Sequence, residues 1–166
     1  MHQKTQEPAA MYRKIDHIAI AVKDLDSALP FFTNILGFRL VRRRHVKGRR
    51  TGMVSAELEH NEINLVLCQG TEPTSQVSRL VEAFGPGVAH IALAVDDIDA
   101  TADSLRSKGL SFDTTIITGN GLRQAFSSRD KNSGLTFELI ERTGEEGFLD
   151  ENVQGLFAQL EKSGNY

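Results

Sequence analysis

The chain has 166 residues, of which 40% are hydrophobic and 25% are charged, and its formal net charge is −3. This length suits one domain, or two small modules that share a core, and the charge excludes a general affinity for nucleic acid. No apolar run approaches the roughly 20 residues that span a bilayer, and the single cysteine, Cys68, excludes an internal disulfide, so we expect a cytoplasmic protein.

The first half of the chain reads as a βαβββ unit. Residues 15–22 are apolar and rich in branched side chains, as in a buried strand. A helix follows, with Asp24 or Asp26 as its N-cap and Gly37 at its end, and Pro30 is expected to kink it. Its inward face is predicted to consist of Leu25, Leu29, Phe32 and Leu36. Further strands are predicted at residues 38–43, 51–58 and 62–68.

The second half repeats this order after a connector that contains a short helix at residues 75–84. A strand at 88–95 and a helix at 97–108, closed by Gly109, are followed by three more predicted strands, at 111–117, 122–128 and 135–140. An additional segment at 147–162 has an amphipathic helical stripe and no counterpart in the first half. We expect this last helix to cover a cavity as a lid.

Two stretches of the sequence are closely similar. DHIAIAVKDLDSA at residues 16–28 recurs as AHIALAVDDIDAT at residues 89–101, and 7 of 13 positions are identical. Each copy opens with a histidine, continues through an apolar segment and ends at an acidic helix start. Such self-similarity indicates a duplicated supersecondary unit. Convergence of two βα openings is the alternative, and the matched histidines argue against it.

The predicted fold is α+β, with two paired βαβββ modules that form a cupped mixed sheet, plus a C-terminal helix. We expect a disordered tail at residues 1–11, one domain at residues 12–146 and the C-terminal helix at residues 147–166. Within the domain, the expected divisions are module 1 at residues 12–70, a connector at 71–86 and module 2 at 87–142. No linker is long enough to separate the modules into independent domains.

A basic run, RRRHVKGRR at residues 42–50, is the strongest charge feature. We interpret it as a solvated hairpin between two strands. The alternative is a rim that attracts an anionic substrate. His45 belongs to this run and His60 lies in a predicted turn, so we expect both to be exposed and to take no part in catalysis.

Three residues remain that could carry chemistry. His17 and His90 occupy equivalent points on the first strands of the two modules, and Glu138 lies between apolar neighbours on the last strand. Such a carboxylate is unusual unless it is paired or binds a cation. If the modules pack about a pseudo-twofold axis, these three side chains meet and form the facial triad of non-haem Fe(II) oxygenases. We therefore predict a central metal; a plain core role for the histidines is the alternative.

In the first module, INLV at residues 63–66 matches FELI at residues 137–140, so we take Asn64 as the equivalent of Glu138. A neutral asparagine is a weak ligand, and we expect three protein ligands, which leave about three positions for a chelating substrate and O₂. A site with four ligands would suit a non-redox metal that stabilises an enolate. The pattern favours an oxygenase over an isomerase.

At these residues the sequence resembles the vicinal oxygen chelate superfamily, which includes glyoxalases, epimerases, extradiol dioxygenases and bleomycin-resistance proteins. The resemblance covers roughly residues 12 to 142. A closer resemblance is to the C-terminal, catalytic half of the 4-hydroxyphenylpyruvate dioxygenase family. It rests on four stretches of this sequence: SQ…FGPGVAHIALAVDDIDAT…LRSKGL at 75–110, QAFS at 124–127, FELIER at 137–142, and Gly147-Phe148, Asn152 and Leu156-Phe157 near the end.

This resemblance implies a set of site residues. His17, His90 and Glu138 would bind Fe(II), with Mn, Co or Zn as alternatives, and Gln124 would act in catalysis by hydrogen-bonding the substrate. The other expected substrate-binding residues are Asn64, Phe126, Phe148 and Asn152. The family reaction implies an α-keto acid that chelates the metal beside O₂ and loses CO₂ by oxidation. Thr136 and Val153 stand where the family has phenylalanines, so we expect a wider or more polar pocket.

Three functions are therefore compared. The first is an Fe(II)-dependent dioxygenase, 4-hydroxyphenylpyruvate dioxygenase-like, acting on a small α-keto acid or an aromatic chelating substrate. The second is a non-redox metal-dependent epimerase or lyase of the methylmalonyl-CoA epimerase or glyoxalase type. The third is a metal-free binding protein of the bleomycin-resistance type. The expected partners are a small molecule and O₂, with no nucleic acid and no membrane, and a homodimer stays open.

Overall fold

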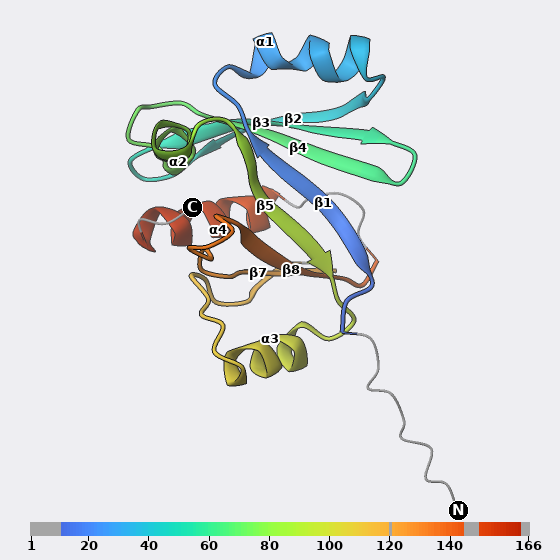
Figure 1. Ribbon diagram of the computed structural model, residues 1–166, viewed down its shortest axis with the longest axis vertical. Coiled ribbons are helices and arrows are strands. Elements are labelled where there is room, and N and C mark those ends of the chain that lie inside the picture. The colour runs from blue at the N-terminus through green and yellow to red at the C-terminus, as the bar shows by residue number, and fades with distance from the viewer. Residues whose placement is uncertain (1–10, 120, 145–149, 164–166) are drawn as a thin grey trace, which may run out of the picture.

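The structure is a computed structural model, and it describes residues 11–119, 121–144 and 150–163. Two βαβββ modules follow each other along the chain (Figure 1). The first consists of β1 (Lys14–Ala21), α1 (Leu25–Pro30), the π-helical turn η1 (Phe31–Ile35), β2 (Arg39–Lys47), β3 (Gly52–His60) and β4 (Ile63–Gly70). The second consists of β5 (Gly87–Ala94), α3 (Ile98–Ser107), β6 (Ile117–Gly119), β7 (Leu122–Phe126) and β8 (Thr136–Arg142). Helix α2 (Gln76–Phe84) connects them, and α4 (Asp150–Ser163) follows the second module.

The strands form one curled mixed sheet in the order β2-β3-β4-β1-β5-β8-β7-β6. Strands β1 and β5 are antiparallel in its centre, whereas β4 runs parallel to β1 and β8 runs parallel to β5. The same strand arrangement thus occurs on both sides of the β1–β5 pair. The predicted α+β fold of two paired βαβββ modules in a cupped sheet is confirmed.

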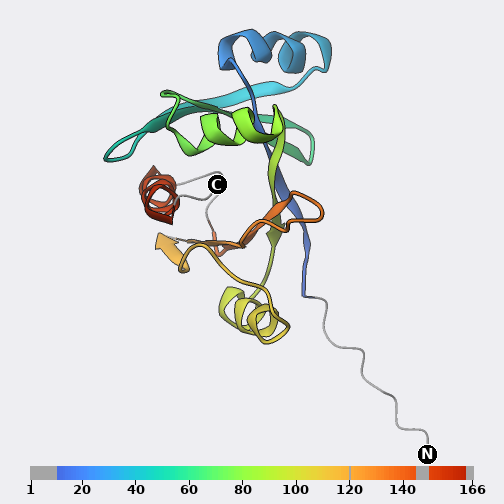
Figure 2. The same ribbon diagram turned by 60° about the vertical axis from the view of Figure 1, so that its left-hand side comes forward.

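Side-chain alternation along the strands divides the core between the two faces of the sheet. On the convex face, α1 packs on the first module and α3 on the second (Figure 1), through two apolar clusters. The concave face is filled from one end by α2 and α4, whose Val77, Leu80 and Phe157 join Ala19, Ala21 and Cys68 in one cluster. Figure 2 shows α4 between the two halves of the sheet, on the side away from β1 and β5.

The two module helices begin at equivalent aspartates. Asp24 caps α1 by accepting a hydrogen bond from the Ser27 amide at 2.7 Å, and Asp97 caps α3 in the same way from Ala100 at 3.0 Å. Side-chain carboxylates satisfy amides that lack a helical partner. Of the two N-caps that the sequence left open for α1, the structure selects Asp24.

Pro30 lies where α1 changes into the π-helical turn η1. Proline has no N–H and disturbs the regular helical ladder, and the following turn closes through a wider bond from the Leu36 amide to the Phe31 carbonyl at 3.0 Å. The sequence predicted a kink at this residue. Its prediction that Leu36 faces inward is wrong, because this side chain is 47% exposed beyond the π-helical turn.

The strand predicted at residues 111–117 is also wrong for most of its length. The described pairing there is a single bridge from Phe112 to Ser127, with backbone hydrogen bonds from the Asp113 amide to the Phe126 carbonyl and from the Ser128 amide to the Ser111 carbonyl, and β6 starts at Ile117. The Thr114 hydroxyl accepts the hydrogen bond of the Phe126 amide at 2.9 Å, and Thr115 bonds Gln159 of α4. Beyond the bridge, side chains thus supply hydrogen-bond partners that a regular strand would take from the backbone. The predicted tail, apart from Met11, and residues 145–149 lie outside the described residues. None of the helices in the described ranges is long and apolar enough to cross a membrane.

Candidate metal centre

The register of the central strands brings His17, His90 and Glu138 to one point. His17 lies opposite Ala92 on β5, and Ala92 lies beside Glu138 on β8. His90 lies opposite Ala19 on β1, two residue pairs along the same strands. All of these side chains face the concave side of the sheet, and the two alanines, both 0% exposed, leave the space that the rings and the carboxylate occupy.

The donor atoms of the three residues are close enough for one cation. His17 Nε2 lies 3.0 Å from Glu138 Oε2, His90 Nε2 lies 3.3 Å from the same oxygen, and the two Nε2 atoms are 3.4 Å apart. Ligands about 2.1 Å from a metal lie about 3.0 Å apart at octahedral angles and about 3.4 Å apart at tetrahedral angles. The three residues are buried. The predicted triad therefore forms a group that could hold a metal ion.

A carboxylate that the sequence analysis overlooked orients the first histidine. Asp16 has no opposite residue on β5, because the ladder shifts register between Ile15 and His17. Its Oδ2 lies 2.8 Å from His17 Nδ1, and Arg142 donates from Nε to Asp16 Oδ1 at 2.8 Å and from Nη2 to Oδ2 at 3.0 Å. In the neutral ring this contact keeps the proton on Nδ1 and leaves Nε2, which is aimed at the triad, as the possible ligand atom. The adjacency of Asp16 and His17 was the available signal.

A second chain of hydrogen bonds fixes the carboxylate of the triad. Gln124 Nε2 donates to Glu138 Oε1 at 2.6 Å, and Gln124 Oε1 accepts from Asn152 Nδ2 at 3.3 Å. Asn152 also donates to the Leu122 carbonyl at 3.2 Å. Asn152 is 1% exposed, lies behind Gln124 and is not among the described residues that line the cavity, and its contact with substrate stays a prediction. Gln124 does line the cavity, and its substrate contact stays a prediction.

Burial and mutual charge set the protonation of the site. Burial alone would lower the pKa of His17, but the charge of Glu138 and the hydrogen bond with Asp16 raise it to about 9. Burial lowers the pKa of His90, against the opposing effect of Glu138. Burial alone would raise the pKa of Glu138, but His17 and His90 together bring it down to about 2. At neutral pH, His17 is therefore the cationic member of the triad.

Burial alone would also raise the pKa of Asp16. The hydrogen bonds from His17 and Arg142 outweigh this effect and hold the pKa well below its usual range. Asp16 is consequently an anion at any physiological pH. Two carboxylates thus face the His17 ring from opposite sides, which is an arrangement that favours positive charge between them.

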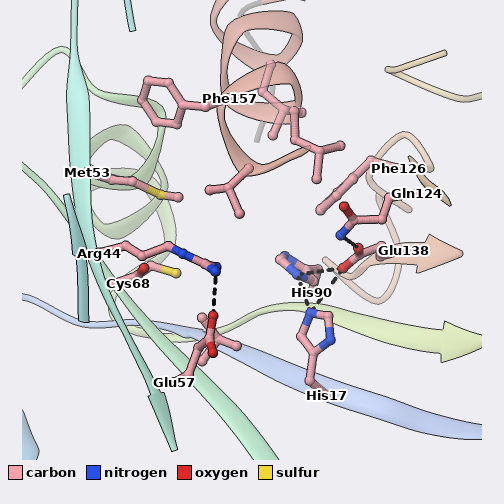
Figure 3. A pocket seen from close by; sticks show the side chains of 15 residues that line it. His17, Arg44, Met53, Glu57, Cys68, His90, Gln124, Phe126, Glu138 and Phe157 are labelled. Carbon is pink, nitrogen blue, oxygen red and sulfur yellow. Dashed lines mark hydrogen bonds and ion pairs between the residues drawn. The ribbon is translucent and has the colours of Figure 1, made fainter. Parts of the chain in front are cut away.

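The triad opens into a cavity with about 550 Å³ of empty space, part of which is open to solvent. Its lining is largely apolar, and α4 forms one wall of it (Figure 3). The rings of Phe126 and His90 pack in a T-shaped arrangement with their centroids 4.7 Å apart. The apolar wall residues are Met53, Val66, Cys68, Phe126, Val153, Leu156, Phe157 and Leu160. Of the predicted pocket residues, Phe126 lines this cavity, whereas Phe148 lies outside the described residues.

The register corrects the assignment of Asn64. Ala19 pairs with Val66 on β4, and the equivalent Ala92 pairs with Glu138 on β8, so Val66 occupies the position of Glu138 in the first module. Asn64 lies two residues away, outside the described lining of the cavity, and donates to the Asp16 carbonyl at 3.4 Å. Valine has no ligand atom, so the expected three-ligand set follows from this position.

One member of the basic run was misplaced by the sequence analysis. Strand β2 continues to Lys47, and alternation turns Arg44 into the cavity, where its Nη1 lies 2.7 Å from Oε1 of Glu57 on β3. The side chains of these two residues are only 8% and 13% exposed. His45 and His60 are exposed, as expected. If residues 42–47 had been predicted as a strand, the alternation of side chains would have placed Arg44 on the opposite face from Arg43 and His45.

Comparison with known families agrees with this geometry. The sequence model of the Glyoxalase/Bleomycin resistance protein/Dioxygenase superfamily matches residues 14–139, a range that includes the whole triad. The chain belongs to this superfamily. The predicted membership in the vicinal oxygen chelate proteins is thus confirmed.

Individual members of the superfamily differ in what they do. The 4-hydroxyphenylpyruvate dioxygenase of Pseudomonas aeruginosa is 29% identical over 184 residues, which cover 89% of this chain and 52% of that protein. A mutant of 4-hydroxymandelate synthase from Streptomyces coelicolor has the same fold with a TM-score of 0.81 at 22% identity, over 91% of this chain and 54% of that one. Methylmalonyl-CoA epimerase from Mycobacterium tuberculosis has a TM-score of 0.70 at 26% identity. The match covers 86% of this chain and 97% of the epimerase chain. The chain spans about half the length of the curated dioxygenases it matches.

Proposed function

We propose that this protein is a non-haem Fe(II)-dependent dioxygenase that acts on a small α-keto acid or a related aromatic chelating substrate. The observation that carries the proposal is the ligand set: two imidazoles and one carboxylate, with Val66 in the fourth symmetric position. Three protein ligands leave about three positions on an octahedral ion, enough for a bidentate substrate and O₂. The relative from Pseudomonas aeruginosa supports the same reaction class.

The residues fit a divalent ion on their own chemistry. The negative charge of Glu138 and the basic nitrogens of His17 and His90 meet in a buried place, where in the metal-free protein a proton on His17 supplies the positive charge. Such a donor set suits Fe(II), Mn, Co or Zn. When bound, a ferrous ion would supply redox chemistry with O₂ and polarise the chelating oxygens of the substrate.

The chain's own residues would then orient the reactants and exclude water. Asp16 fixes the His17 ring, Gln124 fixes the Glu138 carboxylate, and Phe126 packs on the His90 ring. Ligands held in this way keep their geometry when the coordination changes. The apolar side chains of α4, including Leu156 and Phe157, close one side of the cavity and keep bulk water from the reacting atoms.

A metal-dependent epimerase or lyase is the second candidate. It is favoured by the 26% identity to methylmalonyl-CoA epimerase, which the chain covers over 97% of its length, and by the arginine-lined hollow beside the cavity, formed in part by Arg42, Arg43 and Arg44. Such a surface attracts phosphate groups. In this second function the residues of the triad would serve a non-redox ion, and O₂ would play no part.

One experiment separates these functions. Anaerobically purified protein is loaded with Fe(II) or Co(II), and oxygen uptake is followed with a panel of α-keto acids. The proposal predicts oxygen uptake that requires Fe(II), requires a keto acid and is lost in His90→Ala. A protein that binds iron but consumes no O₂ with any member of the panel contradicts it. Turnover of an acyl-CoA that persists without O₂ and with Co(II) would establish the second function instead.

A further inference from the structure

A second polar group faces the triad from the opposite wall of the cavity. Arg44 enters from β2 and Glu57 from β3, and they form an ion pair with 2.7 Å between Nη1 and Oε1. Figure 3 shows this pair on one side of the cavity and the triad on the other. The adjacent Arg43 behaves differently: it pairs with Asp26, and its side chain is 48% exposed.

The sheet register gives the position of the pair relative to the metal centre. Glu57 lies beside Val66, Val66 beside Ala19, and Ala19 opposite His90, so Glu57 and His90 belong to the same row of the sheet. Three strand spacings separate them, which is roughly 14 Å along the sheet and less across its curl. Val66 lies between them in this row, and its apolar side chain lines the cavity. The cavity thus has a metal-binding end, an apolar middle and a polar end.

The fold itself does not need an ion pair at this place. Two charges lose hydration when they are buried, and apolar residues of similar volume in their place are often equally stable or more stable. The cost of burial is visible at Glu57, where desolvation raises the pKa of the carboxyl despite the nearby charge of Arg44. A charged pair kept in the wall of a largely apolar cavity is typical of ligand recognition.

We propose that Arg44 and Glu57 recognise a neutral hydrogen-bonding group, such as a hydroxyl, at the end of the substrate opposite its metal-chelating oxygens. This inference rests on the proposed function, because it takes the triad to hold the chelating end. A guanidinium carries five N–H donors and a carboxylate has about four acceptor sites, so a hydroxyl can bond to both partners. Since the charges of Arg44 and Glu57 cancel, a charged group would introduce an uncompensated charge.

Three matched probes test the inference: phenylpyruvate and its 4-hydroxy and 4-methyl derivatives. Their binding to metal-loaded protein is measured by calorimetry without O₂, so that no turnover is needed. The hydroxyl and methyl groups are similar in size, and only the hydroxyl can bond to the pair. We expect the 4-hydroxy compound to bind about tenfold more tightly than the 4-methyl compound, since hydrogen bonds to charged groups are among the stronger ones.

Two sets of variants assign the preference to the pair. In Arg44→Met with Glu57→Leu, both charges are removed together, and the preference for the hydroxyl is lost while metal binding is kept. The matched control is Arg43→Met with Asp26→Leu, an exposed pair on neighbouring elements, which keeps the preference. In Glu57→Gln the positive charge of Arg44 is uncompensated, and a 4-carboxy derivative becomes the tightest ligand. This single change preserves the side-chain shape and serves if the double variant fails to fold.

Each outcome bears on a different claim. Failure of the protein to bind metal, measured before any probe is added, overturns the proposed function and this inference together. Metal-loaded protein that binds the 4-methyl compound as tightly as the 4-hydroxy compound, or that binds none of the probes, overturns this inference alone. A hydroxyl preference that survives in the folded Arg44→Met, Glu57→Leu variant also overturns it.

Discussion

Ile18 of β1 lies directly opposite Ile91 of β5. The two residues are equivalent in the repeat, because 91 − 18 = 73, the same separation as between His90 and His17. The pseudo-twofold relation between the modules therefore passes through this pair. It places each histidine opposite an alanine of the other strand and both imidazoles on the concave face. The paired imidazole nitrogens of the candidate site thus follow from the duplication, and its carboxylate comes from only one of the modules.

Loss of one paired histidine is expected to remove most of the bound metal. In His90→Ala only two ligands remain, so the dissociation constant for Co(II) or Fe(II) is expected to rise about 100-fold or more. His45→Ala is the control, because His45 is exposed on β2. Equilibrium competition with a chelating dye measures both. Metal content that is unchanged in His90→Ala would exclude the triad as the binding site.

The fourth symmetric position can be tested by supplying a ligand. In Val66→Glu a second carboxylate faces the ion, so metal affinity is expected to rise and keto-acid-dependent oxygen uptake to fall about 100-fold, because no position remains for O₂. Val66→Gln controls for side-chain size, and Asn64→Glu places the same carboxylate two residues away. Neither control is expected to raise metal affinity. If Asn64→Glu tightens metal binding and Val66→Glu does not, the pairing of Val66 with Ala19 between β4 and β1 is refuted.

Asp16 is expected to act through His17. Asp16→Asn weakens the hydrogen bond that fixes the imidazole, and loss of such a partner typically costs about 10-fold to 100-fold in metal affinity. The control is Asp96→Asn. In the wild type, Asp96 pairs with Arg13, and both side chains are 66% exposed. Metal titration well below the melting temperature separates this effect from lost stability. Equal affinities of the wild type and Asp16→Asn would leave Asp16 with only a structural role.

Metal uptake is expected to depend on pH through His17. The pKa of this imidazole is raised to about 9, so at pH 7 the ion must displace a proton from it. His90, whose pKa is lowered, and Glu138, whose pKa is about 2, are already deprotonated. Affinity should therefore rise about tenfold per pH unit between pH 7 and pH 9 and level off above. Calorimetry in two buffers of different ionisation enthalpy measures how many protons are released when the metal binds. Metal binding at pH 7.5 without proton release would contradict the assignment of a raised pKa to His17.

Much of the fold follows from local sequence patterns. The repeated DHIAIAV and AHIALAV stretches identify β1 and β5, and the aspartates after them identify the helix starts. The triad was predictable for the same reason, since a repeated histidine and a glutamate between apolar strand neighbours are both rare by chance. These features depend on the alternation of side chains and on helix capping, which a single stretch of chain determines by itself.

The remaining features depend on how the strands align. A shift of two residues keeps every side chain on the same face, so the polarity pattern of residues 63–66 could not distinguish Asn64 from Val66 as the counterpart of Glu138. Pairing with β1 decides between them. The position of Arg44 could not be predicted from the basic run, because the overall charge of the run indicates an exposed hairpin. Strand β2 extends through this residue, and the alternation of its side chains places Arg44 on the inner face.

The central claim is that His17, His90 and Glu138 bind one shared divalent ion. Crystals of anaerobically purified, iron-loaded protein, measured on both sides of the iron absorption edge, test it most directly. The expected result is a single anomalous peak per chain, about 2.1 Å from both Nε2 atoms and from the Glu138 carboxylate. A peak at another place, or three side chains that keep their mutual contacts with no ion between them, would contradict the claim.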